Sequence, residues 1–153
     1  MTSQTWFITG ANRGIGLAIA RAALAAGHRV VATARQGAAV VEALGDRDDV
    51  LALDLDVTRP AQVRAAVEAA TARFGGIDVL VNNAGYGHLG LFEQTSDADA
   101  RAQFETNVFG MMDVTRAVLP VMRARRSGRV LNLSSVAGMA GFGLPEGKRF
   151  FIV

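Results

Sequence analysis

The sequence predicts an α/β protein with a doubly wound parallel sheet in the strand order 3-2-1-4-5, and three observations lead to this prediction. Short runs rich in Val, Leu and Ile are almost continuously apolar, as strands covered on both faces should be. Alanine-rich segments with apolar residues at helical spacing alternate with these runs. Each strand-helix-strand unit makes a right-handed crossover, so the repeated unit builds one parallel sheet.

Five segments are predicted to be strands because each is short and rich in apolar residues. In chain order they are residues 5–9, 29–34, 50–55, 78–83 and 129–134. The carboxyl ends of parallel strands meet at one rim of the sheet, which is where open α/β sheets bind their ligands. Ser134 and Ser135 stand at that end of the fifth strand.

Helices are predicted between the strands, at residues 14–26, 60–73, 97–104 and 107–126. Gly27 ends the first helix and Pro60 opens the second, which is the usual polarity of these two residues. The last two segments form the longest helical region, and we expect Gly110 and Pro120 to interrupt it.

The composition excludes several classes of protein. Half of the 153 residues are apolar and a fifth are charged, which predicts a compact soluble domain rather than a disordered chain. No apolar run is long enough to span a membrane, and the amino terminus lacks the features of a signal peptide. The absence of Cys excludes disulfides and thiolate metal sites, so we expect a cytoplasmic protein with no metal centre.

The charge pattern gives no sign of a nucleic-acid partner. The net charge is only +2, and the one dense basic cluster is Arg123, Arg125 and Arg126. This cluster ends a predicted helix, where cations meet the negative end of the helix dipole. No aromatic residues alternate with the arginines, as they would in a nucleic-acid surface.

A glycine-rich segment, TGANRGIG at residues 9–16, lies between the first predicted strand and the first predicted helix. This context favours a dinucleotide-binding loop, in which Gly10 allows the turn and Gly14 lets the backbone approach a pyrophosphate. Gly16 would let the helix pack closely on the strand, and the pyrophosphate would meet free N–H groups at the helix start. The predicted cofactor contacts of this loop are Gly10, Asn12, Arg13, Gly14, Ile15 and Gly16.

Two other nucleotide or phosphate folds fit this loop less well. The spacing Gly-x-x-x-Gly-x-Gly differs from the usual dinucleotide motif and from a phosphate loop with Lys and Ser or Thr. A phospho-receiver domain would need acidic residues after the first strand, where Gly10, Ala11 and Asn12 stand instead.

The end of the second strand predicts NADP(H) rather than NAD(H). An NAD site usually has Asp or Glu there to bind the ribose 2′-hydroxyl, whereas this chain has Ala34, Arg35 and Gln36. Arg35 and Arg13 could hold a 2′-phosphate through charge-assisted hydrogen bonds.

With these features the chain closely resembles the short-chain dehydrogenase/reductase family, over residues 5 to about 141. The matching motifs, in family order, are TGANRGIG (9–16), LDVT (55–58), NNAG (82–85), ETN (105–107) and NLSSVAG (132–138). The resemblance implies a Rossmann-like fold and transfer of hydride between a nicotinamide and a carbonyl or secondary alcohol. It also implies small-molecule substrates.

The resemblance assigns cofactor roles to residues after the third and fourth strands. Asp56 would hydrogen-bond the adenine, with Val57 beside the ring. Asn83, Ala84 and Gly85 would form a wall against the adenosine ribose. Taken singly, such residues are also common in turns, and the ordered set of motifs is what favours the cofactor interpretation.

The resemblance also implies two catalytic residues. Asn107 would kink its helix and hold a proton-relay water, and Ser135 would polarise the substrate carbonyl. In the family a Tyr transfers the proton, and a Lys four residues further on lowers the pKa of that Tyr and grips the nicotinamide ribose.

The chain departs from the family at this Tyr and Lys. The family Tyr falls about thirteen residues after the catalytic Ser, where this chain has Lys148, and the position of the family Lys is Ile152. The only Tyr is Tyr86, and no Tyr-x-x-x-Lys occurs. Loss of general acid–base catalysis typically costs about 10²–10⁴-fold in rate, so we expect impaired activity.

We divide the chain into a dinucleotide-binding domain at residues 1–141 and an atypical carboxyl-terminal tail at residues 142–153. Family members continue further, so the sequence suggests a truncated or frame-shifted member that lacks the later strands and helix. The fifth strand would then be an exposed edge, and we expect self-association through this edge and helix 107–126. The tail sequence RFFIV would pair with the edge or promote aggregation.

Three functional interpretations remain open at this point. The first is an NADP(H)-dependent short-chain dehydrogenase/reductase of impaired activity. The second is a non-catalytic NADP-binding or interaction protein, and the third is a non-functional truncated product. The segment 85–93 could border a substrate, and we expect His88 within it to face solvent in a loop rather than to act in catalysis.

Overall fold

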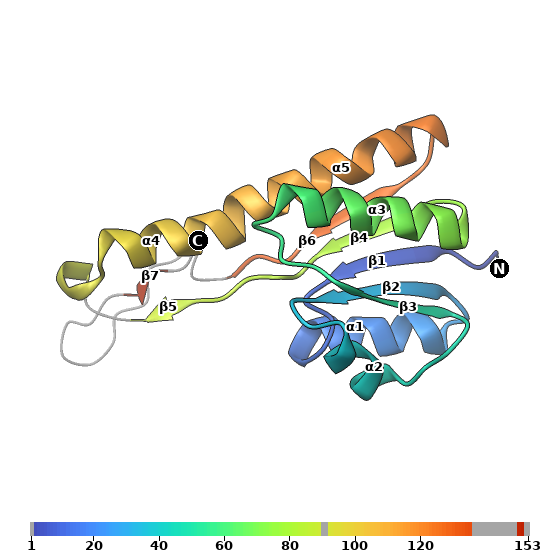
Figure 1. Ribbon diagram of the computed structural model, residues 1–153, viewed down its shortest axis with the longest axis horizontal. Helices are drawn as coiled ribbons and strands as arrows, with labels where there is room; N and C mark the ends of the chain where they lie inside the picture. The colour runs from blue at the N-terminus through green and yellow to red at the C-terminus, as the bar shows by residue number, and fades with distance from the viewer. Residues whose placement is uncertain (1, 90–91, 136–149, 152–153) are drawn as a thin grey trace.

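A computed structural model describes residues 2–89, 92–135 and 150–151, and a five-stranded parallel sheet forms its centre (Figure 1). The strand order β3-β2-β1-β4-β6 confirms the predicted order, since β6 is the fifth strand of this sheet. The strands are β1 (Thr5–Thr9), β2 (Arg29–Ala34), β3 (Val50–Asp54), β4 (Val79–Asn82) and β6 (Arg129–Asn132). β3 and β6 end one and two residues earlier than predicted, and β4 is one residue shorter at each end.

The register places the carboxyl ends of the strands at one rim. Thr9 of β1 is paired with Thr33 of β2, and Asn82 of β4 is paired with Asn132 of β6. The chain leaves β1 toward β2 on one side and returns to β4 on the other side, so the strand order reverses at β1. Ligands of open α/β sheets bind at such a reversal.

Helices cover both faces of the sheet. Figure 1 shows α1 (Gly14–Ala25) and α2 (Ala38–Leu44) below the sheet and α3 (Pro60–Phe74) and α5 (Met111–Ala124) above it. Successive residues of a strand point to opposite faces, and β1 shows this directly. Phe7 packs in the cluster with α3 and α5, whereas Ile8 packs in the cluster with α1, and both are fully buried.

The helix α2 was not among the predicted elements. It is only seven residues long and follows Gly37, with no side-chain cap at its start. Gly37 is instead held by Asp54, whose Oδ1 accepts a hydrogen bond from the Gly37 N–H at 2.6 Å. A tertiary contact therefore fixes the start of α2, and such a contact leaves no local sequence signal.

The long helical region continues through Pro120, so that predicted interruption is wrong. At Gly110 the chain also stays helical, but a π-helical segment ends there and the regular α-helix resumes at Met111. The region comprises α4 (Asp97–Phe104), the π-helical segment η2 (Glu105–Gly110) and α5. Pro120 lies inside α5 on its exposed side, where water can satisfy the carbonyl that loses its partner. Gly110 is a packing residue, because a methyl group there would lie 2.7 Å from Val57 Cγ2.

A second, two-stranded sheet pairs β5 (His88–Leu89) with β7 (Phe150–Phe151) in antiparallel order, next to the short helical turn η1 (Phe92–Gln94). Two expectations change here. His88 is a half-buried strand residue rather than part of a solvent-facing loop. Phe150–Phe151 pair with β5 and not with the edge of the central sheet, while the rest of the tail from residue 142 lies outside the described residues.

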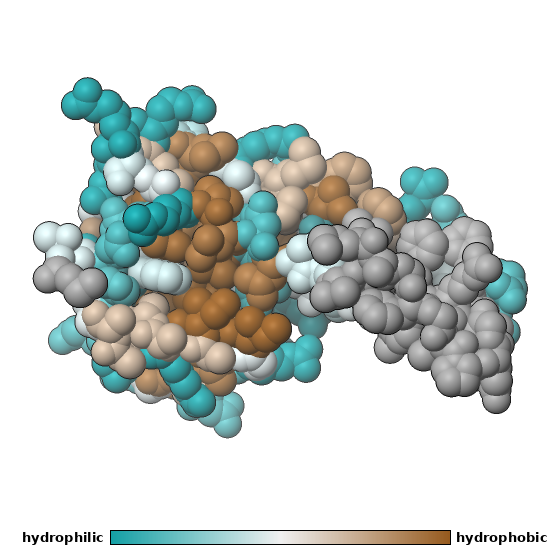
Figure 2. Space-filling model, turned by 180° about the vertical axis from the view of Figure 1, so that it is seen from behind, coloured by the Kyte–Doolittle hydropathy of each residue, from teal (hydrophilic) through white to brown (hydrophobic). Residues whose placement is uncertain are grey.

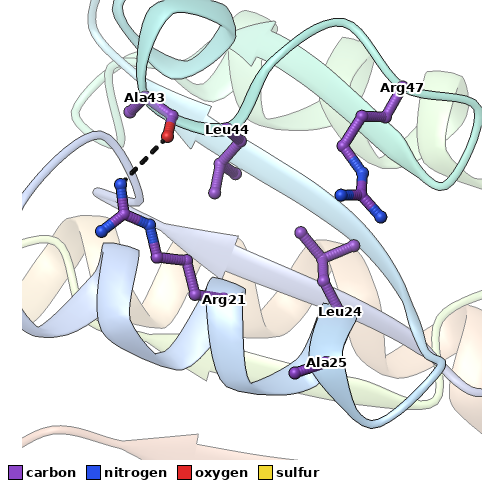
Figure 3. Close-up of a pocket in the computed structure, with 6 residues that line it drawn as sticks. All are labelled: Arg21, Leu24, Ala25, Ala43, Leu44 and Arg47. Atoms are coloured by element: carbon purple, nitrogen blue, oxygen red, sulfur yellow. Dashed lines mark hydrogen bonds between the residues drawn. The ribbon is translucent and has the colours of Figure 1, made fainter.

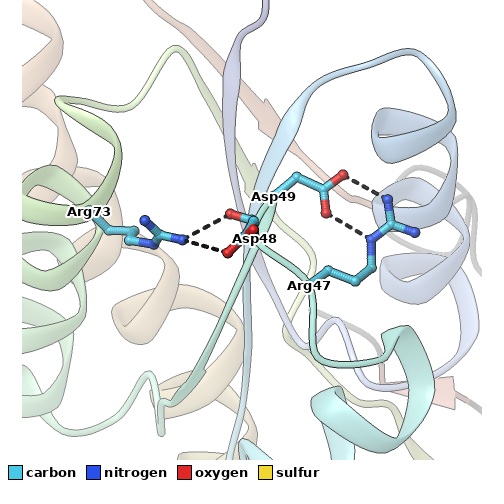
Figure 4. A network of polar contacts seen from close by, with 4 residues as sticks. All are labelled: Arg47, Asp48, Asp49 and Arg73. Carbon is cyan, nitrogen blue, oxygen red and sulfur yellow. Dashed lines mark hydrogen bonds and ion pairs between the residues drawn. The ribbon is translucent and has the colours of Figure 1, made fainter.

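Two exposed ion pairs lie where the chain enters β3 (Figure 4). Arg47 donates two hydrogen bonds to the carboxylate of Asp49, each 2.7 Å long, and Arg73 at the end of α3 pairs with Asp48 at 3.6 Å. The hydrogen bonds from Arg47 hold the pKa of Asp49 below its usual range. Among the described helices, none is both long and apolar enough to cross a bilayer.

Candidate functional site

The glycine loop leaves β1 at the point where the strand order reverses. Gly10 and Gly14 have φ angles of +66° and +56°, a conformation that residues with a side chain rarely adopt. The positive φ angle of Gly10 agrees with the predicted turn, while the close approach of a pyrophosphate to Gly14 stays a prediction. The loop then turns directly into α1 at Gly14.

Asn83, which follows β4, holds this loop in place. Its Nδ2 donates hydrogen bonds to the carbonyl oxygens of Thr9 at 2.8 Å and Gly10 at 3.0 Å. A methyl group at Gly16 would overlap both Asn83 Nδ2 and the Gly10 carbonyl oxygen. The first turn of α1 can therefore approach β4 only because Gly16 has no side chain.

Thr9 joins the same two strands from the other side of the loop, and the sequence analysis did not single it out. Its Oγ1 accepts hydrogen bonds from the N–H groups of Asn83 at 3.0 Å and Ala84 at 2.9 Å. The same hydroxyl donates to the carbonyl oxygen of Val81 at 3.4 Å. The sequence feature that could have indicated this role of Thr9 is the position of a hydroxyl residue directly before the first glycine of the loop.

The amino terminus of α1 is open toward the rim. Arg13 is its N-cap residue and makes no capping side-chain hydrogen bond, and the first turn contains no acidic residue. Arg13, Gly14 and Ile15 are exposed, and Asn12 is half-buried. Free N–H groups and the positive end of the helix dipole make this position favourable for an anion.

Charged side chains from the next two loops lie on the same rim. Arg35 follows β2 and is exposed, and its charge contributes to lowering the pKa of Asp56, which follows β3. The larger causes of that lowered pKa are a hydrogen bond from the Thr58 hydroxyl at 2.7 Å and one from the Thr58 N–H at 3.0 Å. Arg59 pairs with the second carboxylate oxygen of Asp56 at 3.7 Å.

Val57 occupies a different position from its neighbours. It is 6% exposed and belongs to the core cluster between the sheet and helices α3 and α5, where it packs against Gly110. Its place beside an adenine ring stays a prediction. The backbone next to it, at Asp56, is fixed by a hydrogen bond from the Asp56 N–H to Gln62 Oε1 at 2.8 Å.

Asn107 ties the segment after β4 to the π-helical segment η2. Its Nδ2 donates to the carbonyl oxygen of Tyr86 at 2.8 Å, and its Oδ1 accepts from the Tyr86 N–H at 3.1 Å. A methyl group at Gly85 would lie 3.1 Å from the same Oδ1. The π-helical geometry at residues 105–110 agrees with the expected distortion at Asn107, while its proton-relay role stays a prediction.

Ser135 lies half-buried beyond the end of β6, and Ser134 beside it is exposed. The preceding strand residue Asn132 is held to β4, because Asn82 Nδ2 donates to Asn132 Oδ1 at 2.9 Å. The same Nδ2 donates to the hydroxyl of Thr115 in α5 at 2.9 Å. These contacts fix the strand that leads to Ser135.

The structure thus places the glycine loop, Arg35, Asp56, the segment 83–85 and Ser135 after the carboxyl ends of the strands. Asn107 lies within η2 and contacts the segment after β4 at Tyr86. Tyr86 is 46% exposed, and its backbone rather than its hydroxyl is engaged by Asn107. Lys148 lies outside the described residues. No group of three or more metal-ligating side chains occurs within residues 2–89, 92–135 and 150–151.

A shallow groove lies elsewhere in the described part of the chain, between the first two helices. It has a volume of about 320 Å³ and separates α1 from α2, with Leu24 and Leu44 pointing into it and Arg21 donating to the Ala43 carbonyl oxygen at 3.2 Å (Figure 3). This groove is at the carboxyl ends of both helices, opposite the rim just described. The assignment of the site to the rim depends on the geometry of the glycine loop.

Comparison with known proteins identifies one family. A family model described as short chain dehydrogenase matches residues 4–145. Oxidoreductase BOA17 of Botryotinia fuckeliana is 42% identical over 141 residues, which cover 91% of this chain and 52% of that protein. A 3-ketodihydrosphingosine reductase of Bacteroides thetaiotaomicron is 39% identical over 141 residues, covering 92% of this chain and 50% of that protein.

Solved structures give the same result for the fold. A short-chain dehydrogenase from Streptomyces avermitilis aligns with a TM-score of 0.84 and 45% identity, covering 92% of this chain and 52% of that one. ElxO, solved with NADP bound, aligns with a TM-score of 0.85 and 29% identity, covering 92% and 59%. The chain spans about half the length of the curated relatives named here.

Proposed function

Because the chain belongs to the short-chain dehydrogenase family, we propose that it binds NADP(H) on the carboxyl rim and that its capacity for hydride transfer is impaired. The reaction that the family resemblance implies is transfer of a hydride between the nicotinamide and a small-molecule carbonyl or secondary alcohol. We further propose that residues 1–141 form the dinucleotide-binding domain and that residues 142–153 are an atypical carboxyl-terminal tail.

One observation carries the binding proposal: the uncapped start of α1 is held on the rim by the Asn83 contacts to Thr9 and Gly10. A pyrophosphate at this position would accept hydrogen bonds from the free N–H groups of the loop and the first turn. A methyl group at Gly14 would meet nothing within 4 Å, so the space beside Gly14 is open to a ligand. Asn12, Arg13 and Ile15 border the same position.

The preference for NADP(H) rests on the charges at the end of β2. Arg35 and Arg13 are exposed cations on the rim, and Ala34, Arg35 and Gln36 supply no carboxylate for a ribose 2′-hydroxyl. Asp54, which is paired with Ala34 across the two strands, already accepts a hydrogen bond from the Gly37 N–H. The NADP bound to ElxO is compatible with this preference.

The remaining contacts follow the family pattern. In the proposal Asp56 binds the adenine with Val57 beside it, and Asn83, Ala84 and Gly85 line the adenosine ribose. The nicotinamide cofactor, when bound, supplies or accepts the hydride. The hydrogen bonds of Asp56 to Thr58 and of Asn83 to the glycine loop orient both residues before any cofactor arrives.

On the substrate side, the Ser135 hydroxyl would donate a hydrogen bond to the substrate carbonyl and so polarise it. Asn107 would support a proton-relay water at the kinked helix. The family Tyr and its Lys have no counterpart, because Lys148 and Ile152 stand at their positions. The proton donor that the family uses is therefore missing from this sequence, and we expect a rate about 10²–10⁴-fold below that of a complete enzyme.

Calorimetric titration of the purified chain with NADPH and NADH tests this proposal. We expect NADPH to bind more tightly, and Arg35→Ala to remove most of the difference, because a charge-assisted contact to the 2′-phosphate is lost. Equal affinities for the two cofactors at one salt concentration would contradict the NADP(H) preference.

Two glycine variants test the location of the cofactor. Gly14 and Gly27 both have positive φ angles, +56° and +78°, and an added methyl group meets nothing within 4 Å at either position. Alanine at either site therefore imposes the same backbone cost, but only Gly14→Ala would obstruct a pyrophosphate. We expect Gly14→Ala to weaken NADPH binding at least about tenfold and Gly27→Ala to leave it unchanged. Equal effects would place the cofactor elsewhere.

A non-catalytic NADP-binding protein is the second candidate, and the missing Tyr-x-x-x-Lys favours it. A turnover assay with a panel of ketones and aldehydes separates the two candidates. Binding of NADPH without measurable oxidation supports the second candidate, whereas slow carbonyl-dependent oxidation that Ser135→Ala abolishes supports the first. A chain that folds but does not bind NADPH contradicts both.

A further inference from the structure

The turn between β2 and α2 is a polar part of the surface. Arg35 and Gln36 are exposed and Gly37 is buried, so the turn presents two side chains to solvent. By contrast, the face of the molecule in Figure 2 has apolar residues gathered across its middle. The turn follows the carboxyl end of β2, and its first residue is the arginine proposed to bind the 2′-phosphate.

Two consecutive residues at the end of β3 hold both ends of this turn. The Leu55 N–H donates to the carbonyl oxygen of Ala34, the last residue of β2, at 2.7 Å. Asp54 Oδ1 accepts a hydrogen bond from the Gly37 N–H at 2.6 Å. Only residues 35 and 36 lie between the two contacts, so the backbone on either side of Arg35 is fixed to β3.

The contact between Asp54 and Gly37 is close in shape as well as in hydrogen bonding. A methyl group at Gly37 would lie 2.9 Å from Asp54 Oδ1 and 3.0 Å from the carbonyl carbon of Leu53. A carbon atom this close would force the carboxylate to move. The turn therefore meets the end of β3 in this way because residue 37 has no side chain.

Arg35 lies within electrostatic range of the next loop. After the hydrogen bonds from Thr58, its charge is among the smaller causes that lower the pKa of Asp56. On a loose turn the guanidinium would have this carboxylate as an alternative partner to a phosphate. A turn that is held at both ends limits the directions in which the Arg35 side chain extends.

We propose that Asp54 is a positioning residue for the cofactor preference, because it holds the turn in which Arg35 presents its guanidinium to the ribose 2′-phosphate of NADP(H). This inference rests on the proposed function, since it concerns the same phosphate. Asp54 acts through the backbone of Gly37 and does not touch the cofactor. A turn that is ordered beforehand loses less conformational freedom when the phosphate binds.

A carboxylate at this position has two alternative effects. It could accept a hydrogen bond from the ribose 2′-hydroxyl, in which case its removal weakens NADH binding. It could also repel the 2′-phosphate, in which case its removal strengthens NADPH binding. Positioning predicts a third result, which is weaker NADPH binding with NADH binding unchanged. The 2.6 Å hydrogen bond that already occupies Asp54 Oδ1 favours positioning.

Calorimetric titration of the full 153-residue chain with NADPH and NADH tests the proposal. We expect Asp54→Ala to weaken NADPH binding about fivefold and to leave NADH binding within about twofold, because only the 2′-phosphate uses Arg35. Asp54→Asn keeps an oxygen that can accept from the Gly37 N–H, so it should retain the NADPH affinity. Asp49→Ala removes a carboxylate at the other end of the same strand and should change neither affinity.

Three results would overturn the positioning role. The first is a loss of NADH affinity in Asp54→Ala that equals the loss of NADPH affinity. The second is NADPH binding that is unchanged or tighter in this variant. The third is an equal loss of NADPH affinity in Asp54→Ala and Asp54→Asn, since the asparagine variant differs mainly in charge.

A double-mutant cycle with Arg35→Ala shows whether Asp54 acts through Arg35. If it does, Asp54→Ala lowers the NADPH affinity about fivefold in the unmodified chain and has no effect in the Arg35→Ala chain. The same loss in both chains would mean that Asp54 affects the phosphate by another route, and would overturn the proposal.

Hydrogen exchange of the Gly37 amide supplies a measurement that needs no cofactor. We expect this amide to exchange at least about tenfold faster in Asp54→Ala than in the unmodified chain or in Asp54→Asn, because its acceptor is lost. The Leu55 amide donates to a backbone oxygen and should keep its protection, which also verifies that the variant folds. Equal exchange of the Gly37 amide in all three chains would overturn the proposal.

This inference and the proposed function fail in different ways. An unmodified chain that binds NADPH and NADH equally contradicts the NADP(H) preference and overturns the positioning role with it. An unmodified chain that prefers NADPH can still overturn the positioning role alone. That happens if Asp54→Ala accelerates exchange of the Gly37 amide and leaves the ratio of the NADPH and NADH affinities unchanged.

Discussion

The two sides of strand β4 differ sharply, although both are parallel pairings within one sheet. Toward β1 every residue of β4 is buried, and Thr9 and Asn83 join the strand ends through side-chain hydrogen bonds to backbone. Toward β6 the pairing is equally regular, but three of the four β6 residues are exposed. The two pairings therefore differ in how far their residues are buried and not in the regularity of their backbone pairing.

The largest expected effect compares two leucines in adjacent positions. Leu80 of β4 is fully buried, and Leu131 of β6, whose pairing partner is the next residue Val81, is 45% exposed. We expect Leu80→Ala to lower the free energy of unfolding by about 3 kcal/mol, because it leaves a cavity in the core. Leu131→Ala should cost less than about 1 kcal/mol. Urea unfolding measures both, and similar losses would mean that β6 is as well covered as β4.

The next largest effect concerns the contact between α1 and β4. A methyl group at Gly16 overlaps Asn83 Nδ2 and the Gly10 carbonyl oxygen, so we expect Gly16→Ala to cost about 2 kcal/mol of unfolding free energy. Gly14→Ala meets no atom within 4 Å and should cost only about 1 kcal/mol, from its positive φ angle. If the two variants unfold at the same urea concentration, the close packing at Gly16 is not a constraint.

Thr9 gives a smaller effect on the same strand pair. Replacing it with Val removes the acceptor of two N–H groups, those of Asn83 and Ala84, and we expect a loss of about 1–2 kcal/mol in urea unfolding. Thr9→Ser keeps the hydroxyl and is the matched control. Should the serine variant lose as much stability as the valine variant, the methyl group and not the hydrogen bonds would be responsible.

The same contrast explains how far the sequence predicts the structure. The buried strands were located to within two residues, because continuous apolar runs such as that of β1 have no other stable environment in a small domain. The glycine loop was equally predictable, since its conformation requires glycine at Gly10 and Gly14. The apolar runs and the glycine spacing are both local sequence patterns, so they can be identified from a single sequence.

The failures come from contacts between distant parts of the chain. The start of α2 depends on the contact between Gly37 and Asp54, which lies seventeen residues further along the chain. The residues near Gly37 give no sequence signal for this contact. Gly110 looks like a helix break but is required by Val57, and Pro120 is tolerated because it faces solvent. Thr9 was overlooked for the same reason, since its partners Asn83 and Ala84 are more than seventy residues away.

The smallest expected effect concerns Asp56 on the exposed part of the rim. The Thr58 hydroxyl is the main reason why the pKa of Asp56 is lowered, with the Thr58 N–H, Arg59 and Arg35 adding to it against partial desolvation. We expect Thr58→Val to raise the pKa of Asp56 and Thr58→Ser to preserve it, as measured by the NMR titration of the Asp56 carboxyl group.

The pH dependence of stability follows from the direction of this shift. A folded-state pKa below the unfolded value means that the Asp56 carboxylate stabilises the fold above the unfolded pKa of about 3.9, and that this contribution is lost as the pH falls through the folded pKa. The cost of Thr58→Val in unfolding free energy should therefore shrink as the pH is lowered through that window. It should stay below about 1 kcal/mol, because the Asp56 side chain is 31% exposed and solvent screens its charge. A cost that is the same on both sides of the window would mean that Thr58 stabilises the loop through packing rather than through the Asp56 carboxylate.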